Sequence, residues 1–268
     1  MATPIGNLED MTLRAIRVLR EADLIAAEDT RHTRRLLDAY EIRTPLISLH
    51  EHNEEVRTPS LVAAMKEGRS IAHVSDAGTP GLSDPGFRLI RATIAAGIRV
   101  EPIPGVSAVI AALSAAGLPM NRFLFQGFLA AKAVGRRRQL AGLAAETGTL
   151  VFFESPRRLP AMLQDIADVL GNRDVVVCRE LTKIHESFIR ARALDAIAVL
   201  AGGPIKGEIT VLVSGRPETR APWSDAEIMK RFNVLRQDAA LSRRDCVNRI
   251  VAETGLPKSR IYRLTVNA

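Results

Sequence analysis

The sequence has 268 residues, of which 47% are hydrophobic and 25% are charged, and these values exclude a disordered or low-complexity chain. The formal net charge of +7 favours polyanionic partners, whereas the aromatic content of 4% argues against a surface that binds single-stranded nucleic acid by stacking its bases. The two cysteines, Cys178 and Cys246, lie far apart, which excludes a zinc ribbon and argues against a disulfide framework.

The first ten residues, MATPIGNLED, contain neither a basic start nor an apolar core, so we expect no secretory signal and a cytoplasmic location. The longest charge-free stretch, residues 102–121, is interrupted by prolines and glycines. This content predicts a loop followed by a buried helix, and no contact with a membrane.

Short apolar runs alternate with amphipathic segments over the first two fifths of the sequence. Apolar residues that recur every three to five positions predict a helix over residues 11–26. Further helices are expected over 33–40, 59–67, 87–96 and 108–116, and strands over 46–49, 70–75 and 100–103. A strand, a loop and a helix in repetition predict a parallel sheet, so residues 1–116 form the first α/β domain, a doubly wound one.

A second α/β domain is expected over residues 117–215. Its predicted strands are 123–128, 149–153, 174–179 and 208–214, and its predicted helices are 136–145 and 159–169. After a linker-like segment, Ser224 and Ser242 are expected to cap helices that end near residues 236 and 254. With a third helix over 258–264, residues 223–268 form a small basic domain similar to a helix-turn-helix.

Two loops, residues 75–86 and 104–108, each follow a predicted strand and precede a predicted helix. Ligands of open α/β sheets bind beyond the carboxyl ends of the strands, and glycines let a backbone approach a ligand closely. Asp76 is suited to accept hydrogen bonds from ribose hydroxyls or to offset a cationic ligand. A third loop, residues 2–8, is placed to close over the same crevice. None has the glycine spacing of a nicotinamide site or a P-loop.

Other polar groups lie in residues 27–32, 50–53, 153–158 and 179–186. His50 and His52 project to one side of an extended segment, but no third ligand is suitably spaced, so we expect no metal site. Substrate contact or plain surface exposure accounts better for both histidines. Charged residues just past strand ends indicate either a cleft or a solvated rim.

Eight motifs occur in series along the whole chain: ATPIGNLEDMTLRA (2–15), AEDTR (27–31), HEHN (50–53), SDAGTPGLSDPG (75–86), PGVSA (104–108), FESPRR (153–158), RELTK (179–183) and KGE (206–208). Together they resemble the 16S ribosomal RNA cytidine 2′-O-methyltransferase family, within the tetrapyrrole methylase superfamily. The resemblance implies S-adenosylmethionine as donor, an active site between two α/β domains of which the second has a mixed sheet, and a homodimer. It implies as target the ribose of a cytidine in the decoding centre of the small ribosomal subunit.

The resemblance also implies which residues bind the donor. They lie in the motifs around residues 2–8, 75–86, 104–108, 153–158 and 179–183: Pro4, Gly6, Asp76, Ala77, Gly78, Thr79, Ser107, Ala108, Ser155 and Leu181, with Glu154 beside them on the far wall. Transfer to a ribose hydroxyl depends on positioning and on a general base. Four residues remain open as that base: Asp29, Glu28, His52 and Glu180.

Basic residues are the expected contacts to RNA. Arg31 and Lys183 are placed to hold a phosphate beside the reacting ribose, and a second cluster comprises Lys132, Arg136, Arg137 and Arg138. The C-terminal domain has a net charge of +4 from residue 224 onwards, and its expected RNA contacts are Arg243, Arg244, Arg249, Lys258, Arg260 and Arg263. Phosphate contacts of this kind predict binding that weakens steeply with salt. A dimer-supporting cap with a solvated basic face is the alternative.

Two other functions remain open. One keeps the fold and methylates a carbon of a tetrapyrrole; the other is a ligand-responsive regulator that binds nucleic acid through its C-terminal helices. One departure from the family also stands out: its members have an apolar strand immediately before the ATPIGN segment, whereas this sequence begins at Met1. We therefore expect the natural start to lie upstream.

Overall fold

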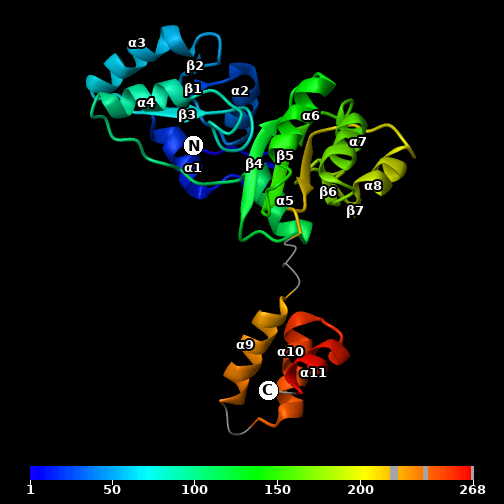
Figure 1. The fold of residues 1–268 in the computed structure, drawn as a ribbon. Coiled ribbons are helices and arrows are strands. Elements are labelled where there is room, and N and C mark those ends of the chain that lie inside the picture. The colour runs from blue at the N-terminus through cyan, green and yellow to red at the C-terminus, as the bar shows by residue number, and fades with distance from the viewer. Residues whose placement is uncertain (218–222, 238–240, 267–268) are drawn as a thin grey trace. The chain divides into compact units, whose positions relative to one another are not determined.

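The computed structural model describes residues 1–217, 223–237 and 241–266. The chain forms two compact units, Met1–Arg216 and Pro217–Ala268, and each is described by itself (Figure 1). The first unit contains two β-sheets covered by helices, and the second contains helices. The expected α/β fold with a helical C-terminal region is therefore confirmed, while the predicted boundary between residues 116 and 117 stays a prediction.

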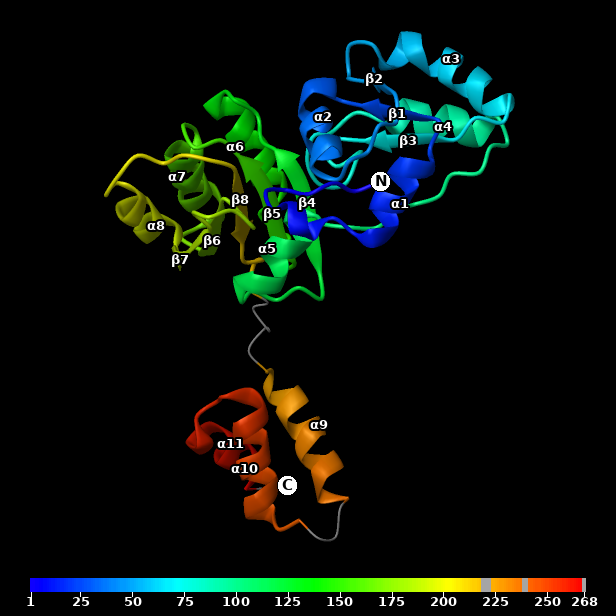
Figure 2. The same ribbon diagram turned by 180° about the vertical axis from the view of Figure 1, so that it is seen from behind.

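The first sheet has three parallel strands in the order β2-β1-β3: β1 (Leu24–Ala27), β2 (Leu46–Ser48) and β3 (Ile71–Val74). The burial of β1 alternates between its two faces. Ile25 packs in one core with α1 (Leu13–Glu21) and α2 (Thr30–Ala39), whereas Ala26 packs in another with α3 (Glu54–Lys66) and α4 (Phe87–Ala95). Helices thus cover both faces of a parallel sheet, as parallel strands require (Figure 2).

The second sheet has five strands in the order β4-β5-β8-β6-β7: β4 (Phe123–Phe128), β5 (Thr149–Glu154), β6 (Asp174–Arg179), β7 (Ser187–Arg192) and β8 (Ile209–Val213). Only the β4–β5 pair is parallel, so this sheet is mixed. Phe152 faces a core built with α6 (Ala133–Gly142), α7 (Leu159–Leu170) and α8 (Ala193–Leu200), whereas Val151 faces α5 (Ala108–Ala116). Both faces of the central strands are therefore buried.

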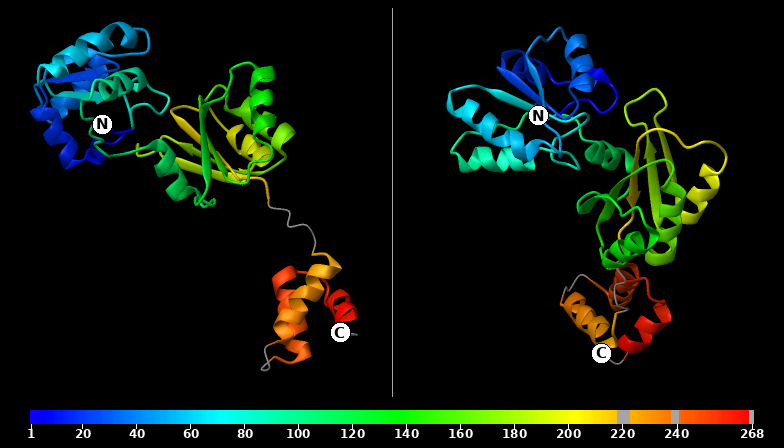
Figure 3. Two further views of the ribbon diagram at one scale, coloured as in Figure 1. Left: turned by 60° about the vertical axis from the view of Figure 1, so that its left-hand side comes forward. Right: turned by 90° about the horizontal axis from the view of Figure 1, so that it is seen from above.

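The C-terminal unit contains α9 (Asp225–Arg236), α10 (Arg243–Thr254) and α11 (Lys258–Thr265) (Figure 3). The hydroxyls of Ser224 and Ser242 each accept a hydrogen bond from the backbone of the third helical residue, whose carboxylate bonds back to the cap. These capping boxes explain why both helices begin where the sequence predicts. The three helices share a core of their own, made of Ile228, Phe232, Leu235, Cys246, Val247, Ile250 and Ile261.

The structure corrects three sequence predictions. The helix predicted over residues 11–26 ends at Glu21, and its last apolar residues belong to β1. Residues 100–103 do not form a strand; their contact with the N-terminal residues includes one hydrogen bond, from the Ala2 amide to the Ile103 carbonyl at 3.2 Å. Strand β7 and helix α8 were not predicted. In their sequence, SFIRARALDAIAVL, the spacing of apolar residues changes from that of a strand to that of a helix, and no glycine or proline marks the boundary.

Two further features bear on the sequence predictions. In the part of the chain that the structure describes, no helix is long and apolar enough to cross a bilayer. Cys178 and Cys246 are both buried and free. Burial raises the pKa of the Cys178 thiol to about 12, so this thiol is unreactive near neutral pH.

Candidate active site

A cavity of about 240 Å³ lies where the loops of the first sheet meet the second sheet. Its lining comes from the loop after β3, the N-terminus of α5, the ends of β4 and β5 and the start of β8. The lining residues include three carboxylates and no lysine or arginine: Ile5, Ala77, Gly78, Thr79, Leu82, Ser83, Asp84, Ser107, Ala108, Phe128, Phe153, Glu154, Glu208, Ile209 and Thr210. The lining thus favours a ligand with an apolar body and a positive charge.

Backbone hydrogen bonds hold three loops together around this cavity. Thr3 and Gly78 exchange two hydrogen bonds of 2.9 Å each, which join the first loop to the second. The Thr79 hydroxyl donates to the Val106 carbonyl at 3.2 Å, which joins the second loop to the third. Gly78 has a φ of 76°, a conformation that glycine adopts without strain. The loops that the sequence singled out therefore form one wall.

Five of the residues predicted to bind the donor line the cavity: Ala77, Gly78, Thr79, Ser107 and Ala108. The other five do not line it: Pro4, Gly6, Asp76, Ser155 and Leu181. Most of these are next to a residue that does, and Gly6 lies against the Lys183 side chain, which leaves no room for a Cβ at position 6. The first loop therefore reaches the second sheet through Gly6.

Glu154 at the end of β5 is 2% exposed, although it is charged and borders the cavity. One carboxylate oxygen accepts hydrogen bonds from the Ser155 amide at 2.7 Å and the Ser155 hydroxyl at 3.3 Å, and forms an ion pair with Arg158 at 3.1 Å. The other oxygen, Oε2, is buried and has no hydrogen-bond partner among the residues that the structure describes. A buried acceptor without a donor is costly, so this oxygen indicates a ligand that donates a hydrogen bond.

Asp84 is the lining residue that the sequence analysis missed and whose chemistry is most altered. Burial raises the pKa of its carboxyl to about 6, and the negative charges of Glu28 and Asp76 contribute. A carboxylate with a pKa near neutrality is suited to accept a proton during a reaction. The sequence contained one signal: a second aspartate in the loop that carries Asp76, three positions before a helix-forming run.

The four candidate bases differ in the hydrogen bonds that their side chains already make. Burial, followed by repulsion from Asp76, raises the pKa of Glu28, whose carboxylate accepts from the Asp76 amide at 3.4 Å. Hydrogen bonds from the Arg31 side chain and amide hold the pKa of Asp29 well below its usual range. Those bonds commit Asp29 to capping α2.

Glu180 is committed in a similar way. It accepts hydrogen bonds from the Glu208 amide at 2.8 Å and from Lys183 Nζ at 3.0 Å, and both lower the pKa of its carboxyl. His52 is exposed and does not line the cavity. Among residues 1–217, 223–237 and 241–266, no group of three His, Cys, Asp or Glu side chains is placed to hold a metal ion.

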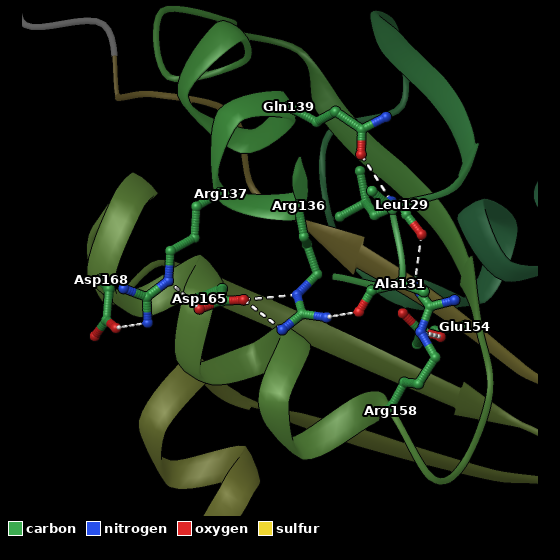
Figure 4. Close-up of polar contacts among 10 residues, drawn as sticks. Leu129, Ala131, Arg136, Arg137, Gln139, Glu154, Arg158, Asp165 and Asp168 are labelled. Atoms are coloured by element: carbon green, nitrogen blue, oxygen red, sulfur yellow. Dashed lines mark hydrogen bonds and ion pairs between the residues drawn. The ribbon is translucent and has the colours of Figure 1, made fainter. Parts of the chain in front are cut away.

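The structure removes Arg136 from the predicted RNA contacts. Its side chain is 6% exposed; its Nε and Nη2 both contact Asp165 at 2.6 Å, and it donates to the Ala131 carbonyl at 3.2 Å (Figure 4). Arg137 is exposed but is bound to Asp165 at 2.5 Å and Asp168 at 3.2 Å. Two residues of the predicted basic cluster therefore belong to an ion-pair network between α6 and α7, whereas Lys132 and Arg138 are exposed.

The remaining predicted RNA contacts differ in accessibility. Arg31 is exposed but paired with Asp29, and Lys183 is paired with Glu180 and Glu208. In the C-terminal unit, Arg243 lies over the Phe232 ring at 5.9 Å, and Arg260 bonds to Asp225 at 2.7 Å. The other four predicted contacts of this unit have exposed side chains: Arg244, Arg249, Lys258 and Arg263.

Comparison with known proteins gives matches over the whole chain. The model of the Tetrapyrrole (Corrin/Porphyrin) Methylases family matches residues 2–197. A Ribosomal RNA small subunit methyltransferase I from Synechocystis is 46% identical over 99% of this chain and 96% of its own length. The protein of the same name from Pseudomonas aeruginosa is 45% identical over 98% and 94%. That from Thermotoga maritima is 46% identical over 97% of its own length, but over only 81% of this chain.

Solved structures show the same fold at lower identity. Uroporphyrin-III-C-methyltransferase from Thermus thermophilus has a TM-score of 0.57 and 24% identity, covering 80% of this chain and 91% of its own. A second structure of that enzyme, complexed with S-adenosyl homocysteine, has a TM-score of 0.54 and 20% identity over 77% and 92%. At this level of identity the likeness establishes the fold and leaves the substrate open.

Proposed function

Because this chain belongs to the ribosomal RNA small subunit methyltransferase I family, within the tetrapyrrole methylases, we propose that it methylates the ribose 2′ oxygen of a cytidine in 16S ribosomal RNA. The target lies at the decoding centre of the small ribosomal subunit. The observation that carries this proposal is 46% identity to a relative of that name over 99% of the chain. The two uroporphyrin-III C-methyltransferase structures, by contrast, share the fold at only 24% and 20% identity.

S-adenosylmethionine is the methyl donor of this proposal, and the cavity suits it. Its positive charge complements Asp84, Glu154 and Glu208. Its amino and hydroxyl groups can donate a hydrogen bond to the unpaired Oε2 of Glu154. The glycine-rich wall around Gly78 allows the backbone to approach it closely. When bound, the donor supplies a methyl group that its sulfonium sulfur has already activated.

Asp84 is the proposed general base. The ribose hydroxyl is a poor nucleophile until its proton is removed, and a carboxylate with a pKa of about 6 is both deprotonated and basic enough to accept that proton at neutral pH. Glu28 supports this role, because its negative charge raises the pKa of Asp84. Asp29 and Glu180 are weaker candidates, since each is held ionised by the hydrogen bonds it accepts.

The RNA is proposed to bind through exposed basic side chains of both units, among them Lys132, Arg244 and Lys258. The cytoplasm is the proposed location, since the substrate is ribosomal RNA. A homodimer is the proposed assembly, on the resemblance of the eight sequence motifs to their family. Sedimentation equilibrium checks the assembly: a mass near 58 kDa supports it, and one near 29.2 kDa contradicts it.

Methyl transfer is tested with small ribosomal subunits from a strain that lacks this methyltransferase. The protein is incubated with methyl-labelled S-adenosylmethionine and these subunits, and the RNA is digested to nucleosides. We expect label in 2′-O-methylcytidine. Label confined to a base would refute the 2′-O position, and the absence of label from both intact subunits and naked 16S RNA would refute the substrate. The Asp84→Asn variant serves as the control for transfer that depends on this site.

A further inference from the structure

A second cavity, separate from the acidic one, lies beside the first residues of α2 and has a volume of about 530 Å³. All three residues of β2 line it, together with Thr30 and the arginines Arg31, Arg34 and Arg57. The volume is in the range of about 300–1,000 Å³ that is usual for ligand sites. No residue from β3 or from the second sheet contributes to the lining.

The charge of this cavity is opposite to that of the acidic one. Three guanidinium groups line it, and no aspartate or glutamate does. Arg31 is paired with Asp29 at 2.7 Å, but the side chains of Arg34 and Arg57 have no ion-pair partner within the described ranges 1–217, 223–237 and 241–266. Guanidinium groups that share a cavity repel one another, and an anion bound among them relieves that repulsion.

The lining also indicates which kind of anion fits. Guanidinium groups bind phosphate oxygens in pairs of hydrogen bonds, which suits a phosphate better than a single point charge would. None of the lining residues is aromatic, so the cavity offers nothing on which a base can stack. The Arg31 side chain is 89% exposed, so a macromolecule can reach the cavity. These features suit the backbone of a nucleic acid and not its bases.

We infer that Arg31, Arg34 and Arg57 bind a backbone phosphate of the substrate RNA. This inference rests on the proposed function, and it adds a second place at which the protein contacts the RNA. Position supports it, because the two cavities flank the same loop contact. The Asp29 amide donates to Asp76 at 2.9 Å; Thr30, next to Asp29, lines the arginine cavity, and Ala77, next to Asp76, lines the acidic one. An RNA strand whose ribose enters the acidic cavity carries phosphates on both sides of that ribose.

The test compares two double variants of the full chain. Arg34→Ala/Arg57→Ala removes two charges from the cavity, whereas Arg35→Ala/Arg91→Ala removes two exposed arginines of α2 and α4 that do not line it. Affinity for a polycytidine oligonucleotide is measured by fluorescence anisotropy at several salt concentrations. Each lost phosphate contact lowers the salt slope by about 0.7, and both arginines contact the same phosphate, so we expect a decrease of about 0.7 for the cavity variant. The control variant should decrease much less.

Three further measurements complete the test. Arg34→Lys/Arg57→Lys should restore the slope, because it keeps the charges, and the affinity for S-adenosylmethionine should stay unchanged in every variant. An equal decrease in both alanine variants would show a general effect of surface charge and overturn the inference, as would no decrease in either. Cytidine monophosphate that binds as tightly as the oligonucleotide would assign the cavity to free nucleotides. Because polycytidine binding does not require methyl transfer, failure of the proposed function remains distinguishable.

Discussion

The carboxylate of Asp84 is partly buried, and the lining of its cavity contains no lysine or arginine. Burial raises its pKa to about 6. The negative charges of Glu28 and Asp76 also raise the pKa of Asp84. The same environment therefore makes Asp84 a better base and a less stable anion.

Replacing Asp84 with asparagine tests its role as a base. We expect kcat to fall by about 10²- to 10⁴-fold, because proton removal by a positioned base contributes that much, with little change in donor affinity. In the unmodified protein, kcat should rise with pH through about 6, as Asp84 loses its proton, and then level off. Single-turnover methylation across pH 5–8 checks both. The matched control is Asp38→Asn, an exposed acid of α2 outside the cavity. A flat pH profile would exclude Asp84 as the base.

The same substitution should stabilise the fold. The folded pKa of Asp84 lies above its unfolded value of 3.8, so the folded state binds more protons between pH 3.8 and about 6, and stability falls as the pH rises through that window. Asparagine carries no charge, so at pH 7 the variant should gain about 1 kcal/mol in the free energy of unfolding, after allowance for solvent screening. Urea unfolding at pH 7 and pH 3.5 measures it. The gain should vanish at pH 3.5, and a gain that persists there would contradict an electrostatic cause.

Glu154→Gln tests whether the unpaired carboxylate oxygen contacts the donor. A hydrogen bond to a charged group contributes about 1.5–3 kcal/mol, so we expect donor affinity to fall by about ten- to a hundredfold. Glu208→Gln is the comparison, since Glu208 lines the same cavity but its side chain is 71% exposed, and its loss should cost about threefold or less. Isothermal titration calorimetry with S-adenosylmethionine distinguishes the two. Equal losses would point to the summed charge of the cavity and not to a specific contact.

The motifs located the cavity but did not identify its reactive groups. Gly78 and Ser107 could be predicted from the sequence, because loops between a strand and a helix bind ligands at the strand ends. Asp84 could not, because its altered pKa arises from burial and from Glu28, which is distant in sequence. Arg136 was mistaken for a surface contact, because its partner Asp165 lies on another helix. Interactions between side chains on different elements therefore could not be predicted from the sequence alone.

Helices α6 and α7 are joined by such a pairing, and Asp165 is its centre. It is 2% exposed and accepts hydrogen bonds from Arg136 and Arg137 (Figure 4). Substituting Asp165 with alanine leaves the Arg136 guanidinium buried without its counterion, and breaking a buried pair in this way costs about 3–5 kcal/mol.

Asp168→Ala provides the matched control for Asp165→Ala. Asp168 is on the same helix and also accepts from Arg137, but its side chain is 40% exposed, so its loss should cost about 1 kcal/mol or less. Urea unfolding compares the two free energies. Equal costs would mean that water reaches Arg136 when Asp165 is removed. RNA affinity should not change in either variant that remains folded, in keeping with the structural role of Arg136.

The strands and helices with clear stop signals were predicted well, and those without were not. Helix α10 begins after the Ser242 cap and ends at Thr254, just before Gly255, so its predicted bounds are confirmed. Between α1 and β1, by contrast, the sequence LREADLIAA has no glycine or proline, and its apolar spacing fits both a helix and the strand that follows. The strand expected over residues 100–103 does not form for another reason. A strand needs a neighbouring strand to which its backbone can hydrogen-bond, and the local sequence does not show whether one lies beside it.

Each of the two compact units has its own hydrophobic core. Seven buried residues of α9, α10 and α11 form the core of the C-terminal unit, and none comes from the first 216 residues. From residue 224 onwards the chain contributes +4 of the total charge of +7. The relative from Thermotoga maritima leaves about a fifth of this chain unmatched. We therefore interpret the C-terminal unit as an accessory to the methylase fold that raises RNA affinity.

A chain that ends at Arg216 tests this interpretation. Because the acidic cavity is lined wholly by residues before position 216, the shortened chain should bind S-adenosylmethionine with unchanged affinity. Among the described residues it loses six exposed cations: Lys230, Arg236, Arg244, Arg249, Lys258 and Arg263. Its affinity for small ribosomal subunits should therefore fall, and its salt slope should decrease by about 4. The full-length variant with alanine at these six positions is the matched control and should reproduce the decrease. If the shortened chain loses RNA affinity but the charge variant does not, the unit acts through its shape and not through its charge.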